Sequence, residues 1–111
     1  MGYPNKHETY IDKSSIHGVG VFSVHSIKAN EKIMMVGNLR LYKHGGDNKW
    51  ITPMARKVNH QKNANCEVRR TNDCYYLWSL KDIKAGEELT NDYTTLPSPP
   101  FGKNINGFKE L

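Results

Sequence analysis

The feature that most constrains the fold is a series of short runs rich in β-branched and aromatic residues, each bounded by turn-forming residues. The runs cover residues 9–12, 19–27, 32–42, 66–70, 74–80 and 88–93. Turn residues separate them at Gly18, Asn30, Gly45, Gly46, Asn63 and Gly86. No apolar pattern is long enough for an amphipathic helix of more than about three turns. The sequence therefore predicts a mostly β fold, with one short helical turn around residues 52–57.

A chain of 111 residues is long enough for one compact domain and too short for two. We expect a single domain over residues 1–111, with its core at about 8–93 and a proline-rich tail at 94–111. No apolar run approaches the ~18 residues of a membrane span, and the first ten residues lack the apolar centre of a secretion signal. We therefore expect a soluble, intracellular protein without a membrane partner, in the cytoplasm or, in a eukaryotic or viral setting, in the nucleus.

The formal net charge of +5 is compatible with binding to a polyanion. The lysines, however, are scattered along the chain, and only the run Glu-Val-Arg-Arg at 67–70 resembles a basic patch. A solvated strand end explains that run as well. We therefore do not expect nucleic acid as the partner.

Two cysteines, Cys66 and Cys74, flank a predicted hairpin whose turn covers residues 71–73. A turn centred on Asn72 places Cys66 opposite Trp78, several residues out of register with Cys74. The sequence thus predicts free thiols rather than a disulfide. Two cysteines are also too few for a structural zinc site.

A short phrase occurs twice, as Ser-Ile-Lys-Ala-Asn-Glu-Lys-Ile at 26–33 and Asp-Ile-Lys-Ala-Gly-Glu-Glu-Leu at 82–89. Each copy has an apolar residue, a turn with Asn30 or Gly86 where positive φ is tolerated, a glutamate and a second apolar residue. This pattern predicts a tight connection between strands with both apolar side chains in the core. Only the second copy runs on into Asp-Tyr at 92–93.

Three separated motifs carry the candidate chemistry: Gly-Val-Gly at 18–20, Asn-His at 59–60 and Glu-Leu-Thr-Asn-Asp-Tyr at 88–93. Each has a structural alternative when taken alone. The glycine pair could form a plain bulge or turn, and the Asn-His pair could form a turn with a capped histidine.

The order of these motifs resembles that of the SET-domain protein-lysine methyltransferases, over about residues 8–93. Residues 56–66 are similar to the family's Arg-Phe-Ile-Asn-His-Ser-Cys-x-Pro-Asn segment, and residues 77–93 resemble its closing segment. The resemblance implies a β-fold of small curved sheets with a C-terminal pseudoknot, which brings the Asn-His and Asp-Tyr pairs together. It also implies methyl transfer from S-adenosylmethionine to a lysine amine of a protein substrate.

The same resemblance assigns site residues. Tyr93 takes the place of the catalytic tyrosine, whose hydroxyl points at the methyl-transfer site; the structural alternative is a core tyrosine with a satisfied hydroxyl. The residues implied to contact S-adenosylmethionine are His17, Gly18, Val19, Gly20, Arg56, Asn59, His60, Tyr93 and Phe101. The backbone of the glycine loop would approach the cofactor closely because glycine lacks a side chain.

The sequence departs from the family pattern at three places. Lys62 stands where many members have a zinc-binding cysteine, and the tail has no cysteine, so no zinc is expected. Phe101 in the tail would then stack on the adenine or close the lysine channel, or a second chain would complete it instead. The family's Tyr-x-Gly element appears only as Met-Val-Gly at 35–37. A catalytically degenerate SET-like module that binds a peptide or protein therefore remains the alternative, and a homodimer that covers exposed strand edges stays open.

Overall fold

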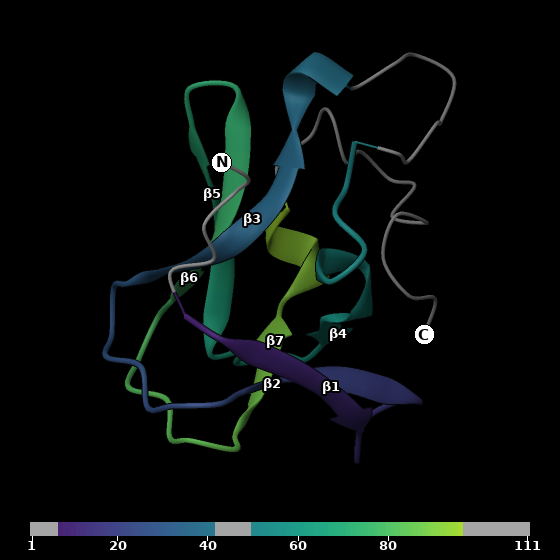
Figure 1. Ribbon diagram of the computed structural model, residues 1–111, viewed down its shortest axis with the longest axis vertical. Coiled ribbons are helices and arrows are strands. Elements are labelled where there is room, and N and C mark those ends of the chain that lie inside the picture. Colours follow the sequence, from purple (N-terminus) through teal and green to yellow (C-terminus); the bar gives the residue numbers. More distant parts are fainter. Residues whose placement is uncertain (1–6, 42–49, 97–111) are drawn as a thin grey trace.

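The computed structural model describes residues 7–41 and 50–96. Its strands are β1 (Thr9–Lys13), β2 (Val19–Ser23), β3 (Lys32–Asn38), β4 (Asn59–His60), β5 (Cys66–Thr71), β6 (Cys74–Ser79) and β7 (Glu88–Asn91). Three short 3-10 helices are η1 (Leu39–Leu41), η2 (Ala55–Lys57) and η3 (Tyr93–Thr95). The protein is mostly β, as the sequence predicts, and η2 lies within the predicted helical turn (Figure 1). None of these described helices has the length and apolar character to cross a membrane.

The last strand, β7, lies in the middle of the strand order β1-β2-β7-β5-β6-β3. It pairs antiparallel with β2 and parallel with both β4 and β5. Figure 1 shows β7, in yellow-green, among strands from the first and middle parts of the chain. The segment that contains the Asp-Tyr motif therefore lies between β2, from the N-terminal part of the chain, and β4 and β5, from its middle.

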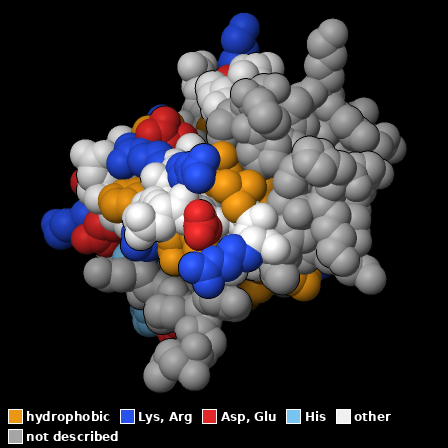
Figure 2. Space-filling view, turned by 90° about the horizontal axis from the view of Figure 1, so that it is seen from above, with side chains coloured by type: hydrophobic (Ala, Val, Ile, Leu, Met, Phe, Trp, Pro, Cys, Tyr) orange, Lys and Arg blue, Asp and Glu red, His pale blue; other side chains and the backbone are white. Residues whose placement is uncertain are grey.

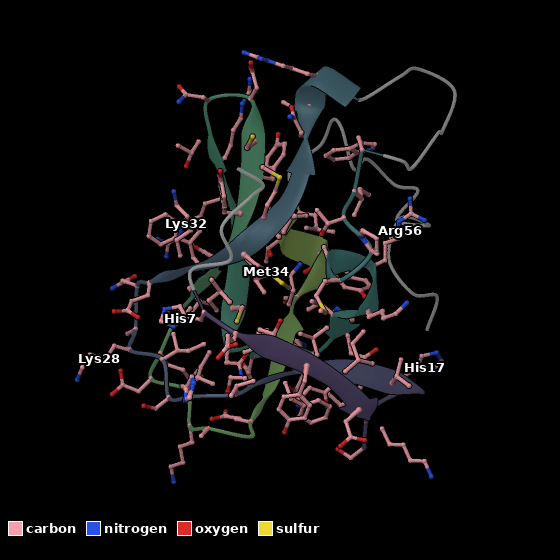
Figure 3. The ribbon with its side chains drawn as sticks, in the orientation of Figure 1. His7, His17, Lys28, Lys32, Met34 and Arg56 are labelled. Carbon is pink, nitrogen blue, oxygen red and sulfur yellow. The ribbon has the colours of Figure 1, made fainter. Side chains whose placement is uncertain are left out.

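The core forms where the inner faces of the strands meet. The residues that are at most 2% exposed include Val21, Ile27, Ile33, Met34, Val36, Leu77, Ile83 and Leu89. Met34 lies at the centre of the molecule in Figure 3. Gly37 lets Trp50 pack against β3, because a Cβ at Gly37 would lie 2.6 Å from the indole ring. On the face in Figure 2, basic side chains lie among acidic and apolar ones.

The hairpin of β5 and β6 differs from its predicted register by one residue. Thr71 pairs with Cys74, and Cys66 pairs with Ser79 rather than Trp78. The reason is that Asn72 takes a positive φ of 55°, so two residues complete a turn to which the sequence assigned three. Both cysteines are nevertheless free thiols, as expected.

The two copies of the repeated phrase pair with each other. Ile27 and Ile83 pair with each other as an isolated antiparallel bridge and exchange both backbone hydrogen bonds, at 2.8 and 2.7 Å. Asn30 and Gly86 both take positive φ, at 62° and 83°, as the sequence predicts. Each copy therefore closes its own turn and also binds the other copy.

Two buried serines add equivalent hydrogen bonds to the two copies. The Ser79 hydroxyl donates to the Lys28 carbonyl, and the Ser23 hydroxyl donates to the Lys84 carbonyl of the opposite copy at 2.9 Å. The Ser79 N–H donates to the Glu31 carbonyl at 2.9 Å, just as the Ser23 N–H donates to the Glu87 carbonyl at 3.1 Å. The strand that leads into each turn is thus fixed by the other turn, with approximate two-fold symmetry.

We predict that Ser79→Ala lowers the free energy of unfolding by about 1–3 kcal/mol, because it also removes the acceptor of the Glu31 N–H. Ser15→Ala, at an exposed position, is the control and should change stability by less than about 0.5 kcal/mol. Denaturant titration measures both variants. Equal effects would mean that the Ser79 hydroxyl does not hold the two turns together.

Candidate active site

The Asn-His pair occupies the short strand β4, directly after η2. Thr52 starts that turn, since its hydroxyl accepts from the Ala55 N–H at 3.2 Å, and Pro53 follows where a helix tolerates proline. The pairing of β4 with β7 then places Asn59 opposite Thr90 and His60 opposite Asn91. The predicted contact between the Asn-His and Asp-Tyr segments is confirmed.

The half-buried His60 side chain holds the backbone of Tyr93. Its Nδ1 accepts a hydrogen bond from the Tyr93 N–H at 2.9 Å, and the two rings lie 5.1 Å apart at 55°. Because Nδ1 is the acceptor, this geometry assigns the proton of a neutral imidazole to Nε2. His60 therefore orients the turn that carries the tyrosine.

Tyr93 begins η3 and is only 5% exposed. Asp92 caps this turn, and its carboxylate accepts from the Thr94 hydroxyl and N–H, which lowers the pKa of that carboxyl. The Tyr93 hydroxyl donates to the Val58 carbonyl at 2.6 Å. The hydroxyl of Tyr93 is thus satisfied as a donor, which agrees with the structural alternative of a core tyrosine. Its oxygen can also accept a hydrogen bond.

Asn59 is fully buried beneath the glycine loop. Its Nδ2 lies within hydrogen-bond distance of four acceptors: Ser14 Oγ at 3.0 Å, the His17 carbonyl at 3.1 Å, the Val19 carbonyl at 3.1 Å and Glu88 Oε2 at 2.8 Å. Its Oδ1 is buried and has no hydrogen-bond partner among the described residues. A buried acceptor without a donor destabilises a fold by about 1–3 kcal/mol, which makes this atom a candidate ligand contact.

The Glu88 carboxylate explains why residue 20 is glycine. Both of its oxygens accept from the Ser14 hydroxyl at 2.9 Å, and a Cβ at Gly20 would lie 2.2 Å from Oε2. Gly18 has a different reason, since its φ of 49° lies in the left-handed region. Both glycines of the motif thus have structural causes, and together they shape the loop above Asn59.

Two further predicted residues lie at the margin of this centre. His17 is exposed, and its carbonyl rather than its side chain contacts Asn59. Arg56 lines an open pocket with Ile51, Pro53 and Lys57. In Figure 3 His17 and Arg56 lie on the same side of the molecule, at the end of the β1–β2 hairpin and beside η2. Phe101 lies outside the described residues.

Sequence reasoning missed three residues that build the site: Ser14, Asn65 and Glu88. The Asn65 carboxamide binds β7, since it accepts from the Thr90 N–H at 2.9 Å and donates to the Glu88 carbonyl at 2.8 Å. Asn65 and Glu88 were visible as members of the two motif segments, but nothing in the sequence indicated their partners. Ser14 gave no signal at all.

Asn91 adds a second buried polar group near the tyrosine. It is fully buried, and neither atom of its carboxamide has a hydrogen-bond partner in the part of the chain that the structure describes. No metal cluster accompanies these residues, because residues 7–41 and 50–96 contain no group of three or more histidine, cysteine or acidic side chains placed for a metal ion.

Comparison with known proteins agrees with this geometry. The family model of the SET domain matches residues 38–94. Histone-lysine N-methyltransferase set9 of Schizosaccharomyces pombe is 39% identical over 70 residues, which covers 51% of this chain and 15% of that protein. The chain thus spans about 15% of the length of the curated relative that it matches.

Solved structures of the same fold are more distant in sequence. A candidate histone methyltransferase of Plasmodium falciparum superposes with a TM-score of 0.62 at 22% identity, over 81% of this chain and 96% of that one. A humanized mutant of Chaetomium thermophilum Polycomb Repressive Complex 2 with a bound inhibitor gives 0.59 at 21% identity, over 83% of this chain and 16% of the matched chain. These structures establish similarity of fold. With the family match over half of its length, the chain belongs to the SET-domain family.

We predict that Gly20→Ala destabilises the protein by about 1–3 kcal/mol, because the new methyl group overlaps the Glu88 carboxylate. In a Glu88→Ala background the same change should be clearly less destabilising, since the overlapping group is gone. A double-mutant cycle of unfolding free energies measures this coupling. Additive effects would show that the carboxylate does not occupy the space above Gly20.

Cys66 provides a test of burial at the contact between β5 and β7. Burial raises the pKa of its thiol to about 12, with only partial compensation by a backbone hydrogen bond from Thr90. Its thiolate is therefore scarce at pH 8, and we expect a thiol reagent to modify the partly exposed Cys74 first. Cys66 should react only at much higher pH or after unfolding. Mass spectrometry of the modified peptides identifies the site, and rapid labelling of Cys66 at pH 8 would contradict the buried position.

Proposed function

We propose that this chain is a protein-lysine N-methyltransferase that transfers a methyl group from S-adenosylmethionine to the side-chain amine of a substrate lysine. One observation carries the proposal: in a member of the SET-domain family, Asn59 contacts the Gly18–Gly20 loop, and the adjoining His60 holds Tyr93. We assign the catalytic contact to Tyr93. We assign the cofactor contacts to the Gly18–Gly20 loop and Asn59, with His17, Arg56 and His60 beside them.

The buried Asn59 oxygen supports a fit to this cofactor. Nδ2 of Asn59 is held by protein acceptors, and Oδ1 is left as an acceptor that a ligand donor would satisfy. The α-ammonium group of a methionine moiety has three such donors. Arg56 and Lys57, which line the open pocket with two apolar neighbours, would attract its carboxylate. We therefore propose that Asn59 and Arg56 hold the two charged ends of the amino-acid part.

When bound, S-adenosylmethionine supplies an electrophilic methyl carbon on a sulfonium. The lysine ammonium would first lose a proton to solvent. The transfer would then form a carbon–nitrogen bond and break the carbon–sulfur bond, whose electron pair stays on sulfur. Because free lysine has a pKa of about 10.4, a site with little water favours the neutral amine that the reaction needs. Alignment of the reacting groups would be the largest contribution of the protein.

Tyr93 is suited to orient the amine. Its hydroxyl proton is directed to the Val58 carbonyl, and its backbone is held by His60. The phenolic oxygen can then accept a hydrogen bond from the lysine amine or attract the transferring methyl group by its partial negative charge. His60 acts in this proposal as a positioning residue, because its side chain contacts Tyr93.

We base the proposed substrate class on the relatives rather than on the site. The curated relative is a histone-lysine N-methyltransferase, so histone tails are the first substrates to test. The rival function is a non-catalytic SET-like module. Met35, which stands in the place of the family's Tyr-x-Gly tyrosine, favours it because this side chain is buried in β3 and offers no hydroxyl.

We predict that the chain binds S-adenosylmethionine in a calorimetric titration and transfers labelled methyl groups to histone lysines. Tyr93→Phe should reduce kcat by at least about 100-fold with little change in cofactor affinity, because it removes only the hydroxyl. Tyr75→Phe is the matched control, since Tyr75 is also buried, at 3% exposed against 5%, and lies on β6.

The outcomes separate the two functions. Cofactor binding and Tyr93-dependent labelling support the enzyme. Binding without labelling of any protein in a histone and cell-lysate panel favours the peptide-binding module, and absence of cofactor binding contradicts the methyltransferase. Equal labelling by wild type and Tyr93→Phe would overturn the role given to Tyr93.

A further inference from the structure

The strand β1 forms an exposed end of the sheet. It stands first in the strand order, with only β2 beside it among the described strands. Figure 1 shows it in dark purple at the front of the molecule. Tyr10 is 38% exposed and Ile11 42% exposed, which is high for large apolar side chains within a strand. Natural proteins protect such edges or use them for pairing with another chain.

The direction of the backbone groups follows from the β1–β2 ladder. The Val24 N–H donates to the Glu8 carbonyl at 3.1 Å, and the Ser14 N–H donates to the Gly18 carbonyl at 2.9 Å. Because backbone groups alternate along a strand, residues 8, 10, 12 and 14 face β2. The N–H and C=O groups of Thr9, Ile11 and Lys13 therefore point outward, where the Lys13 N–H bonds only the carboxylate of Asp12 at 2.7 Å.

We propose that β1 pairs antiparallel with β1 of a second copy, about a two-fold axis at Ile11. Thr9 then lies opposite the partner's Lys13, and the two Ile11 residues face each other. All three outward residues of each copy form hydrogen-bonded pairs, which gives about six backbone hydrogen bonds. The sheet β7-β2-β1 of one copy continues into the sheet of the other.

Charge selects this register over its neighbours. An axis at Asp12 places two aspartates opposite each other, and an axis at Lys13 does the same with two lysines. An axis at Tyr10 places Glu8 opposite the partner's Asp12. Like charges directly opposite each other on neighbouring strands are destabilising. The axis at Ile11 avoids all three conflicts and is the one that pairs the whole of β1.

The side chains fit the same arrangement. The two Ile11 side chains cover each other on one face of the joined sheet. On the other face Tyr10, which stacks on Phe22 with ring centroids 5.5 Å apart, lies opposite the partner's Asp12. Its hydroxyl can donate to that carboxylate, which releases the Lys13 N–H for the ladder. The pairing thus replaces the local hydrogen bond between Lys13 and Asp12 with hydrogen bonds between the two copies.

Sedimentation of the 111-residue chain over a range of concentrations tests the proposal without reference to its activity. The wild type should show a concentration-dependent monomer–dimer equilibrium. Ile11→Lys should abolish it, because two lysines would then face each other. Leu80→Lys is the control, since Leu80 is likewise 42% exposed but lies outside β1, and this variant should still dimerise. A wild type that stays monomeric, or equal loss in both variants, would overturn the proposal.

Crosslinking tests the register. Two Ile11→Cys residues in a hydrogen-bonded pair would have Cα atoms about 5.5 Å apart, within the range of a disulfide. In a Cys74→Ser background, oxidation should crosslink Ile11→Cys into a dimer and leave Tyr10→Cys largely monomeric, because each residue 10 faces residue 12 of the other copy. Crosslinking of Tyr10→Cys in preference to Ile11→Cys would contradict the axis at Ile11.

Discussion

The position of β7 is the constraint on which the rest of the molecule depends. This strand of four residues pairs with β2, β4 and β5, so one segment joins the N-terminal hairpin to the middle of the chain. The paired turns at Ile27 and Ile83 fix where it starts, and the carboxamide of Asn65 fixes its course. Without the pairing of β7 with β4, Asn59 and His60 would not lie beside Tyr93.

The site itself is built from buried polar groups, which makes their pairing energetically important. Removal of a buried polar group from water is unfavourable unless its hydrogen bonds are replaced. The Asn59 nitrogen is surrounded by acceptors, whereas its oxygen and both polar atoms of Asn91 have no partner among the described residues. This imbalance is typical of a functional site that gives up some stability for a ligand. It is also the feature that separates Asn59 from an asparagine in a plain turn.

Several elements were predictable because their causes are local. Positive φ at Asn30 and Gly86, the helical turn near Ala55 and most of the strand runs follow from turn chemistry and apolar patterning. The hairpin register was wrong by one residue, since whether a turn closes in two or three residues depends on the backbone of Asn72. The contact of His60 with Tyr93 was expected only through the family resemblance, and the role of Ser14 was not expected.

The sequence by itself determined a β-rich fold, its turns, and the three motifs that place it among SET domains. It could do so because apolar periodicity, glycine and asparagine act on their immediate neighbours. Only the tertiary structure decided that the two copies of the repeated phrase bind each other, that Glu88 fills the space above Gly20, and that His60 accepts from the Tyr93 backbone. These contacts join residues far apart in the chain, and such pairs are fixed by how the strands pack, which no local pattern specifies.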